Sequence, residues 1–132
     1  YEMFTSYGHG KLGNQAFTIE LARRLKEIGE NNVTVNGLNP GTIPSGITRH
    51  LGLFLSFGHL LIQPINKTVV SGAYTTINVA TSAKFEGISG KWFEHSAMVP
   101  CASKAHDRQD AMKIWKLAEE LTKVSSIEVC GL

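Results

Sequence analysis

The sequence predicts an α/β fold, and three observations carry that prediction. Apolar residues recur every three or four positions over residues 7–28, which is typical of an amphipathic helix. Residues 33–41, VTVNGLNPG, begin with β-branched residues and end in Pro-Gly, as a short strand entering a loop does. A second helical pattern and a second short strand follow. The order strand, helix, strand indicates a right-handed crossover, so we expect the two strands to be parallel.

The first predicted helix covers residues 7–28 and has one apolar stripe, formed by Phe17, Leu21, Leu25 and Ile28. Its charged residues are expected mostly on the opposite, solvent-facing side: Glu20, Arg23, Arg24, Lys26 and Glu27. Gly29 follows the last apolar residue, which is a common way for a helix to stop.

Beyond the first strand, residues 42–64 mix Gly, Pro, Ser and aromatic residues, and we expect a long loop there. A second helix is predicted over residues 65–83. Its shared face is Val69, Ala73, Thr76, Ile77 and Ala80, with Gly72 allowing close approach to a neighbour. The stretch GISGKWF, residues 87–93, then indicates a short strand.

The last predicted helix covers residues 107–123 and begins at Asp107, a favourable N-cap residue. Its stripe consists of Ala111, Ile114, Trp115, Ala118 and Leu121. Two strands are too few to make a sheet that three such helices would cover. We therefore expect either a part of a larger fold or a chain that completes its sheet with a partner.

Composition excludes several classes of protein. The 132 residues suit one domain, and 42% hydrophobic with 18% charged residues is typical of a soluble globular chain. A net charge of +2, spread along the chain, makes no case for nucleic acid. Cys101 and Cys130 lack the spacing of a zinc site or a disulfide framework. The longest apolar run, residues 51–62, falls short of the roughly 20 residues that span a bilayer, and no signal-peptide pattern is seen.

Two stretches carry candidate chemistry. In YGHGK, Tyr7 and Lys11 lie four apart on a helix and so share a face. An ammonium one turn away stabilises a phenolate, which would let the tyrosine exchange protons near neutral pH; the alternative is an exposed tyrosine beside a solvated lysine. In NGLNPGTIPS, residues 36–45, a Pro-Gly turn follows the carboxyl end of a strand, where ligands of open α/β sheets bind. A plain strand-to-loop turn is the alternative.

In this order, the motifs resemble a family. Tyr-x-x-x-Lys on a helix, then Glu-Leu-Ala, then Val-x-Val-Asn-x-x-x-Pro-Gly is similar to the carboxyl-terminal half of short-chain dehydrogenases/reductases. The resemblance covers nearly the whole chain and is greatest to the branch of retinol dehydrogenases and the WW-domain-containing oxidoreductase. It implies a partial Rossmann-like, doubly wound three-layer fold, the carboxyl-terminal half of a parallel sheet with flanking helices. Residues 1–132 would be its catalytic and substrate half, without the dinucleotide-binding half.

The resemblance also implies a function: an NAD(P)-dependent oxidoreductase that interconverts an alcohol and a carbonyl compound by hydride transfer. Tyr7 would be the acid/base, and Lys11 would hold the nicotinamide ribose. The stretch along the nicotinamide would be Pro40, Gly41, Thr42, Ile43 and Ser45. NADP is slightly favoured over NAD, and no metal is expected.

The loop at residues 51–62 corresponds to the family's substrate region. Leu53, Phe54 and Phe57 would line a pocket for a lipophilic alcohol, aldehyde or ketone such as a retinoid or steroid, or rest on a membrane surface; a core-packing helix is the alternative. We expect a cytoplasmic or intracellular membrane-associated protein, with a homo-oligomer or a sheet-completing partner left open.

The sequence also departs from the family. It contains no Gly-rich dinucleotide fingerprint, and Tyr7 stands too close to the start for the family's upstream catalytic serine. Alone, the chain is expected to be inactive or nearly so. The alternative function is therefore a truncated, inactive remnant that acts as a partner-binding module through an exposed sheet edge.

Overall fold

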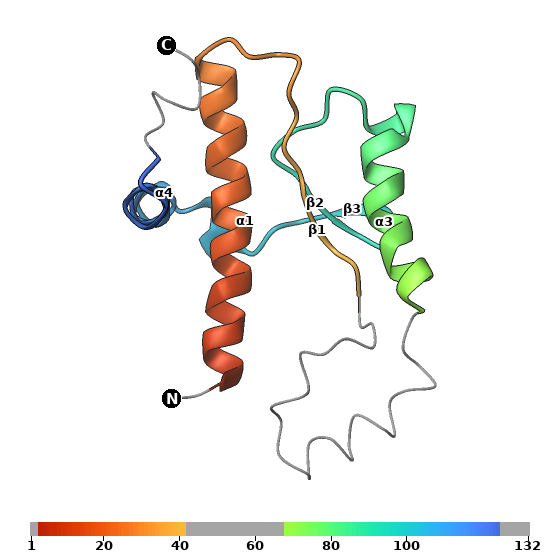
Figure 1. Cartoon of the computed structure of the whole chain (residues 1–132), viewed down its shortest axis with the longest axis horizontal. Coiled ribbons are helices and arrows are strands. Elements are labelled where there is room, and N and C mark those ends of the chain that lie inside the picture. The colour runs from red at the N-terminus through yellow and green to blue at the C-terminus, as the bar shows by residue number, and fades with distance from the viewer. Residues whose placement is uncertain (1–2, 42–67, 125–132) are drawn as a thin grey trace. The chain divides into compact units, whose positions relative to one another are not determined.

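The computed structural model describes residues 3–41 and 68–124 (Figure 1). Its elements are α1 (Met3–Glu27), β1 (Gly37–Asn39), α3 (Val69–Thr81), the 3₁₀ turn η3 (Ala83–Phe85), β2 (Trp92–Glu94), β3 (Ala97–Val99), the 3₁₀ turn η4 (Ser103–His106) and α4 (Arg108–Thr122). This is an α/β chain with a small mixed sheet, consistent with the predicted partial Rossmann-like fold.

Helix α1 confirms the first predicted helix and its stop. Gly29 has φ 77°, the left-handed conformation that glycine adopts without strain. The N–H of Glu30 donates to the carbonyl of Leu25 at 2.9 Å, and the N–H of Gly29 donates to that of Lys26 at 3.2 Å. These two bonds form a Schellman motif, so the last carbonyls of the helix are satisfied by its own chain.

One prediction about α1 was wrong. Glu20, which we expected on the solvent-facing side, is only 2% exposed. Its carboxylate accepts hydrogen bonds from Arg23 Nε at 2.8 Å and from Arg24 Nε at 2.7 Å. Two guanidinium groups on the same helix replace the water that the charge gives up, which is why a carboxylate can be buried here.

Both predicted strands exist, but they are shorter than the sequence indicates. Strand β1 starts at Gly37 rather than at residue 33, and β2 starts at Trp92 rather than at residue 87. Before β1, the chain is held partly by side chains, since the N–H of Val35 donates to Ser89 Oγ at 3.0 Å. The N–H of Gly90 donates to the carbonyl of Val35, and the N–H of Gly37 donates to the carbonyl of Lys91. The bonded positions increase together along the two segments, which confirms that the strands are parallel.

The third strand was not predicted. Strand β3 follows β2 after only His95 and Ser96, and the sheet order is β1-β2-β3. His95 and Ser96 have φ values of 51° and 62°, as a two-residue hairpin turn requires. Histidine and serine are poor signals for such a turn, which usually carries Asn or Gly, and this is why the sequence pattern did not show the hairpin.

Helices α3 and α4 confirm the remaining helical predictions. Residues 65–67 of the second predicted helix and the predicted loop over residues 42–64 lie outside the described residues. At α4 the predicted cap is present, because Asp107 Oδ1 accepts from the N–H of Gln109 at 2.9 Å and of Asp110 at 3.1 Å. Within the described residues, no helix is long and apolar enough to span a bilayer.

The chain forms two compact units, and the boundary between them passes through the strands. The first unit contains α1, η4 and α4, with α4 seen end-on beside α1 in Figure 1. There the Phe17 and Trp115 rings stack at 5.1 Å between centroids, and Arg24 lies 4.3 Å over Trp115. Its buried side chains include Ala16, Trp92, Ala105 and Ala111.

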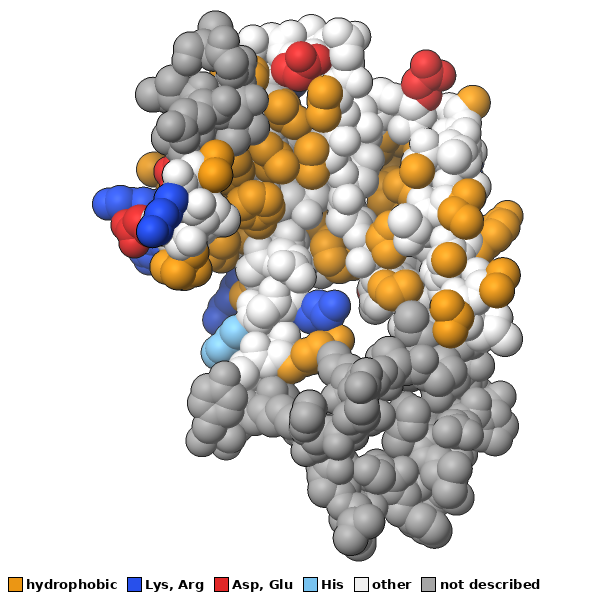
Figure 2. Space-filling view, viewed as in Figure 1, with side chains coloured by type: hydrophobic (Ala, Val, Ile, Leu, Met, Phe, Trp, Pro, Cys, Tyr) orange, Lys and Arg blue, Asp and Glu red, His pale blue; other side chains and the backbone are white. Residues whose placement is uncertain are grey.

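The second unit contains α3 and η3, and its core includes Phe85 and Phe93, which meet edge to face at 4.9 Å. Gly72 is buried, as the close-approach prediction requires, together with Thr75. The expected apolar face was wrong in its orientation: Val69 is 63% and Ile77 58% exposed, and hydrophobic side chains show along α3 in Figure 2. The buried positions of α3 are Gly72, which has no side chain to hold a neighbour away, and Thr75.

Candidate active site

Tyr7 and Lys11 lie together near the start of α1. The ammonium nitrogen of Lys11 is 5.4 Å from the centroid of the Tyr7 ring, within the range of a cation–π contact. Tyr7 is 53% exposed. The spacing therefore produces the expected pair on one helical face, while its catalytic role stays a prediction.

The turn that carries this pair has free space around it. A side chain built on Gly8 or Gly10 would meet no heavy atom within 4 Å outside the local helix. Each glycine makes a helix about 1 kcal/mol less stable than alanine would, so Gly8 and Gly10 weaken this part of α1.

Pro40 and Gly41 follow β1 in the second unit. Gly41 has φ 85°, and its N–H donates to Asn39 Oδ1 at 3.1 Å. Asn39 in turn donates through Nδ2 to Glu94 Oε1 at 3.3 Å. The turn is therefore shaped by Asn39, and Gly41 presents bare backbone, to which a flat ligand could come close.

The other predicted site residues cannot be placed. Thr42, Ile43 and Ser45, together with Leu53, Phe54 and Phe57, lie outside the described residues. Tyr7 and Lys11 belong to the first unit and Pro40 and Gly41 to the second, and each pair is described within its own unit. Sequence reasoning missed the role of Asn39, although an Asn just before Pro-Gly is a recognised turn signal.

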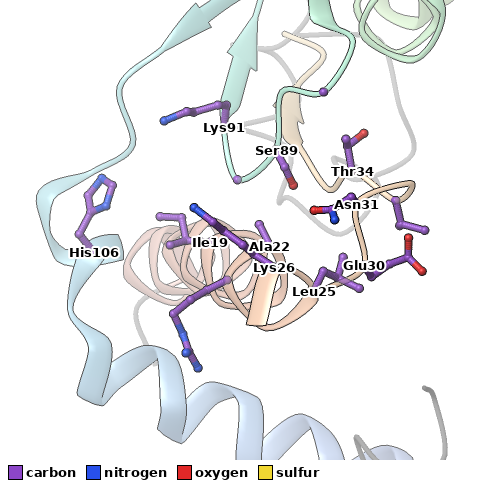
Figure 3. Close-up of a pocket in the computed structure, with 14 residues that line it drawn as sticks. Ile19, Ala22, Leu25, Lys26, Glu30, Asn31, Thr34, Ser89, Lys91 and His106 are labelled. Carbon is purple, nitrogen blue, oxygen red and sulfur yellow. The ribbon is translucent and has the colours of Figure 1, made fainter. Parts of the chain in front are cut away.

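The sequence also gave no sign of a pocket of about 550 Å³ elsewhere in the first unit (Figure 3). It lies at the carboxyl end of α1 and includes Lys26, Lys91 and His106, but not Tyr7 or Lys11. No periodicity or motif joins positions so far apart in the chain. Among the described residues, no group of three or more His, Cys, Asp or Glu side chains is arranged to hold a metal ion.

Cys101 lines a second pocket, of about 440 Å³, together with Lys91 and His106. Burial raises the pKa of the Cys101 thiol, and the positive charge of Lys91 opposes this only in part. The thiol is therefore mostly protonated near neutral pH, and a thiol is a weaker nucleophile than a thiolate.

Comparison with known proteins identifies relatives along almost the whole chain. It is 37% identical over 127 residues to human retinol dehydrogenase 14, covering 90% of this chain and 35% of that protein. It is 35% identical over 116 residues to mouse retinol dehydrogenase 12, covering 88% of the chain and 35% of the relative. It is 33% identical over 124 residues to the chicken WW domain-containing oxidoreductase, covering 93% of the chain and 29% of the relative.

No family model matches the chain. The chain spans about a third of the length of the curated relatives it matches. Those relatives, which include a protein named as a short-chain dehydrogenase, are similar to it over 88% or more of its residues. The similarity agrees with the α/β architecture. The homologues of this chain are thus members of the short-chain dehydrogenase/reductase family, among them retinol dehydrogenases and the WW domain-containing oxidoreductase.

Proposed function

We propose that the chain is the carboxyl-terminal, catalytic part of an NAD(P)-dependent oxidoreductase that interconverts an alcohol and a carbonyl compound. The observation that carries this proposal is the ammonium of Lys11, 5.4 Å from the Tyr7 ring, in a chain whose homologues are named dehydrogenases and oxidoreductases. A phenol beside a fixed cation is suited to exchange a proton with an oxygen atom.

In this proposal, Tyr7 donates its hydroxyl proton to the carbonyl oxygen of the substrate during reduction and accepts it back during oxidation. Lys11, one helical turn away, supplies a positive charge next to the phenolate that remains. Its amine also binds the ribose hydroxyls of the nicotinamide cofactor. When bound, the cofactor supplies or accepts the hydride.

The residues at the end of β1 suit such a cofactor. Gly41 has no side chain and a positive φ of 85°, so backbone alone faces a ring placed against this turn. Pro40 fixes the direction of the chain there, and Asn39 holds the N–H of Gly41 at 3.1 Å. Thr42, Ile43 and Ser45 complete the proposed contacts. NADP is slightly favoured over NAD.

For the substrate we propose a lipophilic alcohol, aldehyde or ketone, such as a retinoid or steroid. Two observations support this class: relatives are named retinol dehydrogenases, and the apolar segment 51–62 contains Leu53, Phe54 and Phe57. Such a substrate fits a protein in the cytoplasm or at an intracellular membrane.

A second candidate is a catalytically inactive module that binds a protein partner. One observation favours it, namely the exposed apolar face of α3, where Val70 is 82%, Tyr74 64% and Ile77 58% exposed. Exposed apolar patches of this kind are common in interaction surfaces.

The test is a chimaera in which the dinucleotide-binding part of human retinol dehydrogenase 14 precedes the full chain. We expect it to bind NADPH, measured by tryptophan fluorescence, and to reduce all-trans-retinaldehyde. The variant Tyr7→Phe should lose at least about 100-fold in rate, the usual contribution of a general acid. Tyr74→Phe is the matched control, since that tyrosine is similarly exposed, at 64%, but lies on α3.

Full activity in the Tyr7→Phe chimaera would overturn the acid/base assignment. A chimaera that binds NADPH but reduces no aldehyde, with Tyr7 present, would support the inactive partner-binding module instead.

A further inference from the structure

The pocket at the carboxyl end of α1 has the size of a small-molecule site. Its volume of about 550 Å³ lies within the roughly 300–1,000 Å³ that such sites occupy. Three segments of the first unit build it: the second half of α1 with the loop that follows, the turn before β2, and η4. Because these segments belong to one compact unit, the pocket does not depend on how the two units are placed.

The lining of this pocket has two parts. Along α1, Ile19, Ala22 and Leu25 provide an apolar floor. Lys26, Lys91 and His106, one from each segment, bring nitrogen-bearing side chains to one side of the same space, as Figure 3 shows. An apolar floor beside a group of hydrogen-bond donors suits a ligand that has a polar head and an apolar body.

The charge of the lining is distinctly positive. Arg23, Lys26 and Lys91 stand against a single carboxylate, that of Glu30, which leaves a formal charge of +2 with histidine neutral. The formal net charge of the entire chain is also +2. Arg23 is paired with Glu20 and Glu27, which do not line the pocket, so the positive charge that faces the pocket is mainly that of Lys26 and Lys91.

Two of these cations are available to a ligand. Arg23 is engaged by Glu20 at 2.7 Å and by Glu27, and Glu30 accepts from the N–H of Asn32 at 2.7 Å. Within residues 3–41 and 68–124, no carboxylate lies within ion-pair distance of the Lys26 or Lys91 amine. Lys26 lies in the last turn of α1, where the helix dipole stabilises a positive charge.

We propose that this pocket binds an amphiphilic phosphate monoester, with the phosphate held by Lys26 and Lys91 and the apolar body lying on Ile19, Ala22 and Leu25. A phosphate dianion matches two ammonium groups better than a single charge does, and its several oxygen atoms can accept from both. His106 adds a third nitrogen donor beside Lys91.

This site is separate from the proposed active site and does not rest on it. Lys11 and Lys26 are fifteen positions apart on α1, which corresponds to about 22 Å along a helix axis. A ligand of this size bound at Lys26 and Lys91 therefore leaves Tyr7 free.

The experiment titrates the full chain with octyl phosphate by isothermal calorimetry, and compares inorganic phosphate and octanol as probes of the head and the body alone. We expect octyl phosphate to bind at least about 10-fold more tightly than either, since it uses both parts of the pocket. In the double variant Lys26→Gln/Lys91→Gln, its affinity should fall at least about 10-fold, and raising the salt concentration should weaken binding to the original chain.

The matched control is Lys113→Gln/Lys116→Gln, which removes the same charge from α4 at residues outside the pocket; its affinity should stay within about 2-fold of the original. Far-UV circular dichroism verifies that both double variants keep their helices. Equal affinity in the two double variants would overturn the proposal, as would tighter binding of octanol than of octyl phosphate or no binding of octyl phosphate at millimolar concentration.

A vesicle arm identifies the source of the phosphate. Sedimentation with phosphatidic acid vesicles that is lost in Lys26→Gln/Lys91→Gln would support the site and identify a lipid headgroup as its ligand. Binding of soluble octyl phosphate alone would support the site with a free metabolite as its ligand.

Discussion

The Trp92 ring occupies the space that a side chain at Gly37 would need. A Cβ atom on Gly37 would lie 2.2 Å from Trp92 Cζ3 and 2.3 Å from Cε3, and Trp92 is only 6% exposed. Neither the ring nor the backbone at the start of β1 can move without disturbing the packing of the first unit. The substitution Gly37→Ala should therefore lower the free energy of unfolding by about 2–4 kcal/mol, as overpacking of a core does.

Urea denaturation followed by tryptophan fluorescence measures this loss. Gly13→Ala is the control, because a Cβ there meets nothing within 4 Å and the residue lies inside α1. Alanine at that helical position should stabilise the chain by about 0.5–1 kcal/mol. Equal stability of Gly37→Ala and the original chain would show that the Trp92 ring does not hold this position.

Burial of Glu20 predicts a loss of stability in acid. The hydrogen bonds from Arg23, with those from Arg24, lower the pKa of the Glu20 carboxyl from 4.5 to about 2 against the opposing effect of burial. Because the folded-state pKa is lowered, its contribution is fully present above the ordinary pKa. It is lost as the pH falls from about 5 towards 2.

Glu20→Gln should cost about 1–3 kcal/mol at pH 7, since the two guanidinium groups lose a charged acceptor. The difference in unfolding free energy between the original chain and this variant should shrink as the pH is lowered from 5 to 2, measured by urea titration at each pH. A difference that stays constant across this range would contradict the ion-pair origin of the effect.

The comparison between sequence and structure shows what periodic patterns can reveal. Residue spacing and capping chemistry predicted the three helices, both parallel strands and the Asp107 cap, because all of these features depend on residues that are close in the sequence. Glu20 did not, because a charged residue is assigned to the solvent unless its partners are known, and those partners act only in the folded helix. The His95–Ser96 turn lacked the residues that usually mark a hairpin.

In the candidate site too, local features could be predicted from the sequence and long-range ones could not. Spacing alone brings Lys11 to the Tyr7 ring, since four residues make about one helical turn. The convergence of Lys26, Lys91 and His106 could not be predicted, because it depends on how three distant segments pack.

Trp115 supplies a prediction about the packing of α4. Its ring stacks on Phe17 at 5.1 Å, yet its Nε1 is buried and has no hydrogen-bond partner within residues 3–41 and 68–124. Trp115→Phe keeps a stacked ring and removes the unpaired N–H donor. The stability lost with the smaller apolar ring and the stability gained by no longer burying an unpaired donor should cancel to within about 1 kcal/mol. Trp115→Ala removes the ring and should cost about 3 kcal/mol or more.

Thermal unfolding followed by circular dichroism compares the two variants. If Trp115→Phe were as unstable as Trp115→Ala, the indole N–H would make a hydrogen bond that stabilises the fold. The description of this N–H as an unpaired donor would then be wrong.

Asn39 supplies the last prediction, which rests on the proposed function. Its Oδ1 accepts from the N–H of Gly41 at 3.1 Å, and its Nδ2 donates to Glu94 at 3.3 Å. In the chimaera, Asn39→Ala should free the Pro40–Gly41 turn and weaken NADPH binding by about 5- to 30-fold, the effect of losing one or two hydrogen bonds of about 1 kcal/mol each. Asn39→Asp keeps the acceptor for Gly41 but places a second carboxylate beside Glu94, so its affinity for NADPH should lie between those of Asn39→Ala and the original chain.

Fluorescence titration with NADPH measures the affinity of all three proteins. The control is Asn14→Ala, a substitution at an exposed residue of α1. Unchanged affinity in Asn39→Ala would mean that the shape of this turn does not contribute to cofactor binding, even if Tyr7→Phe abolishes activity.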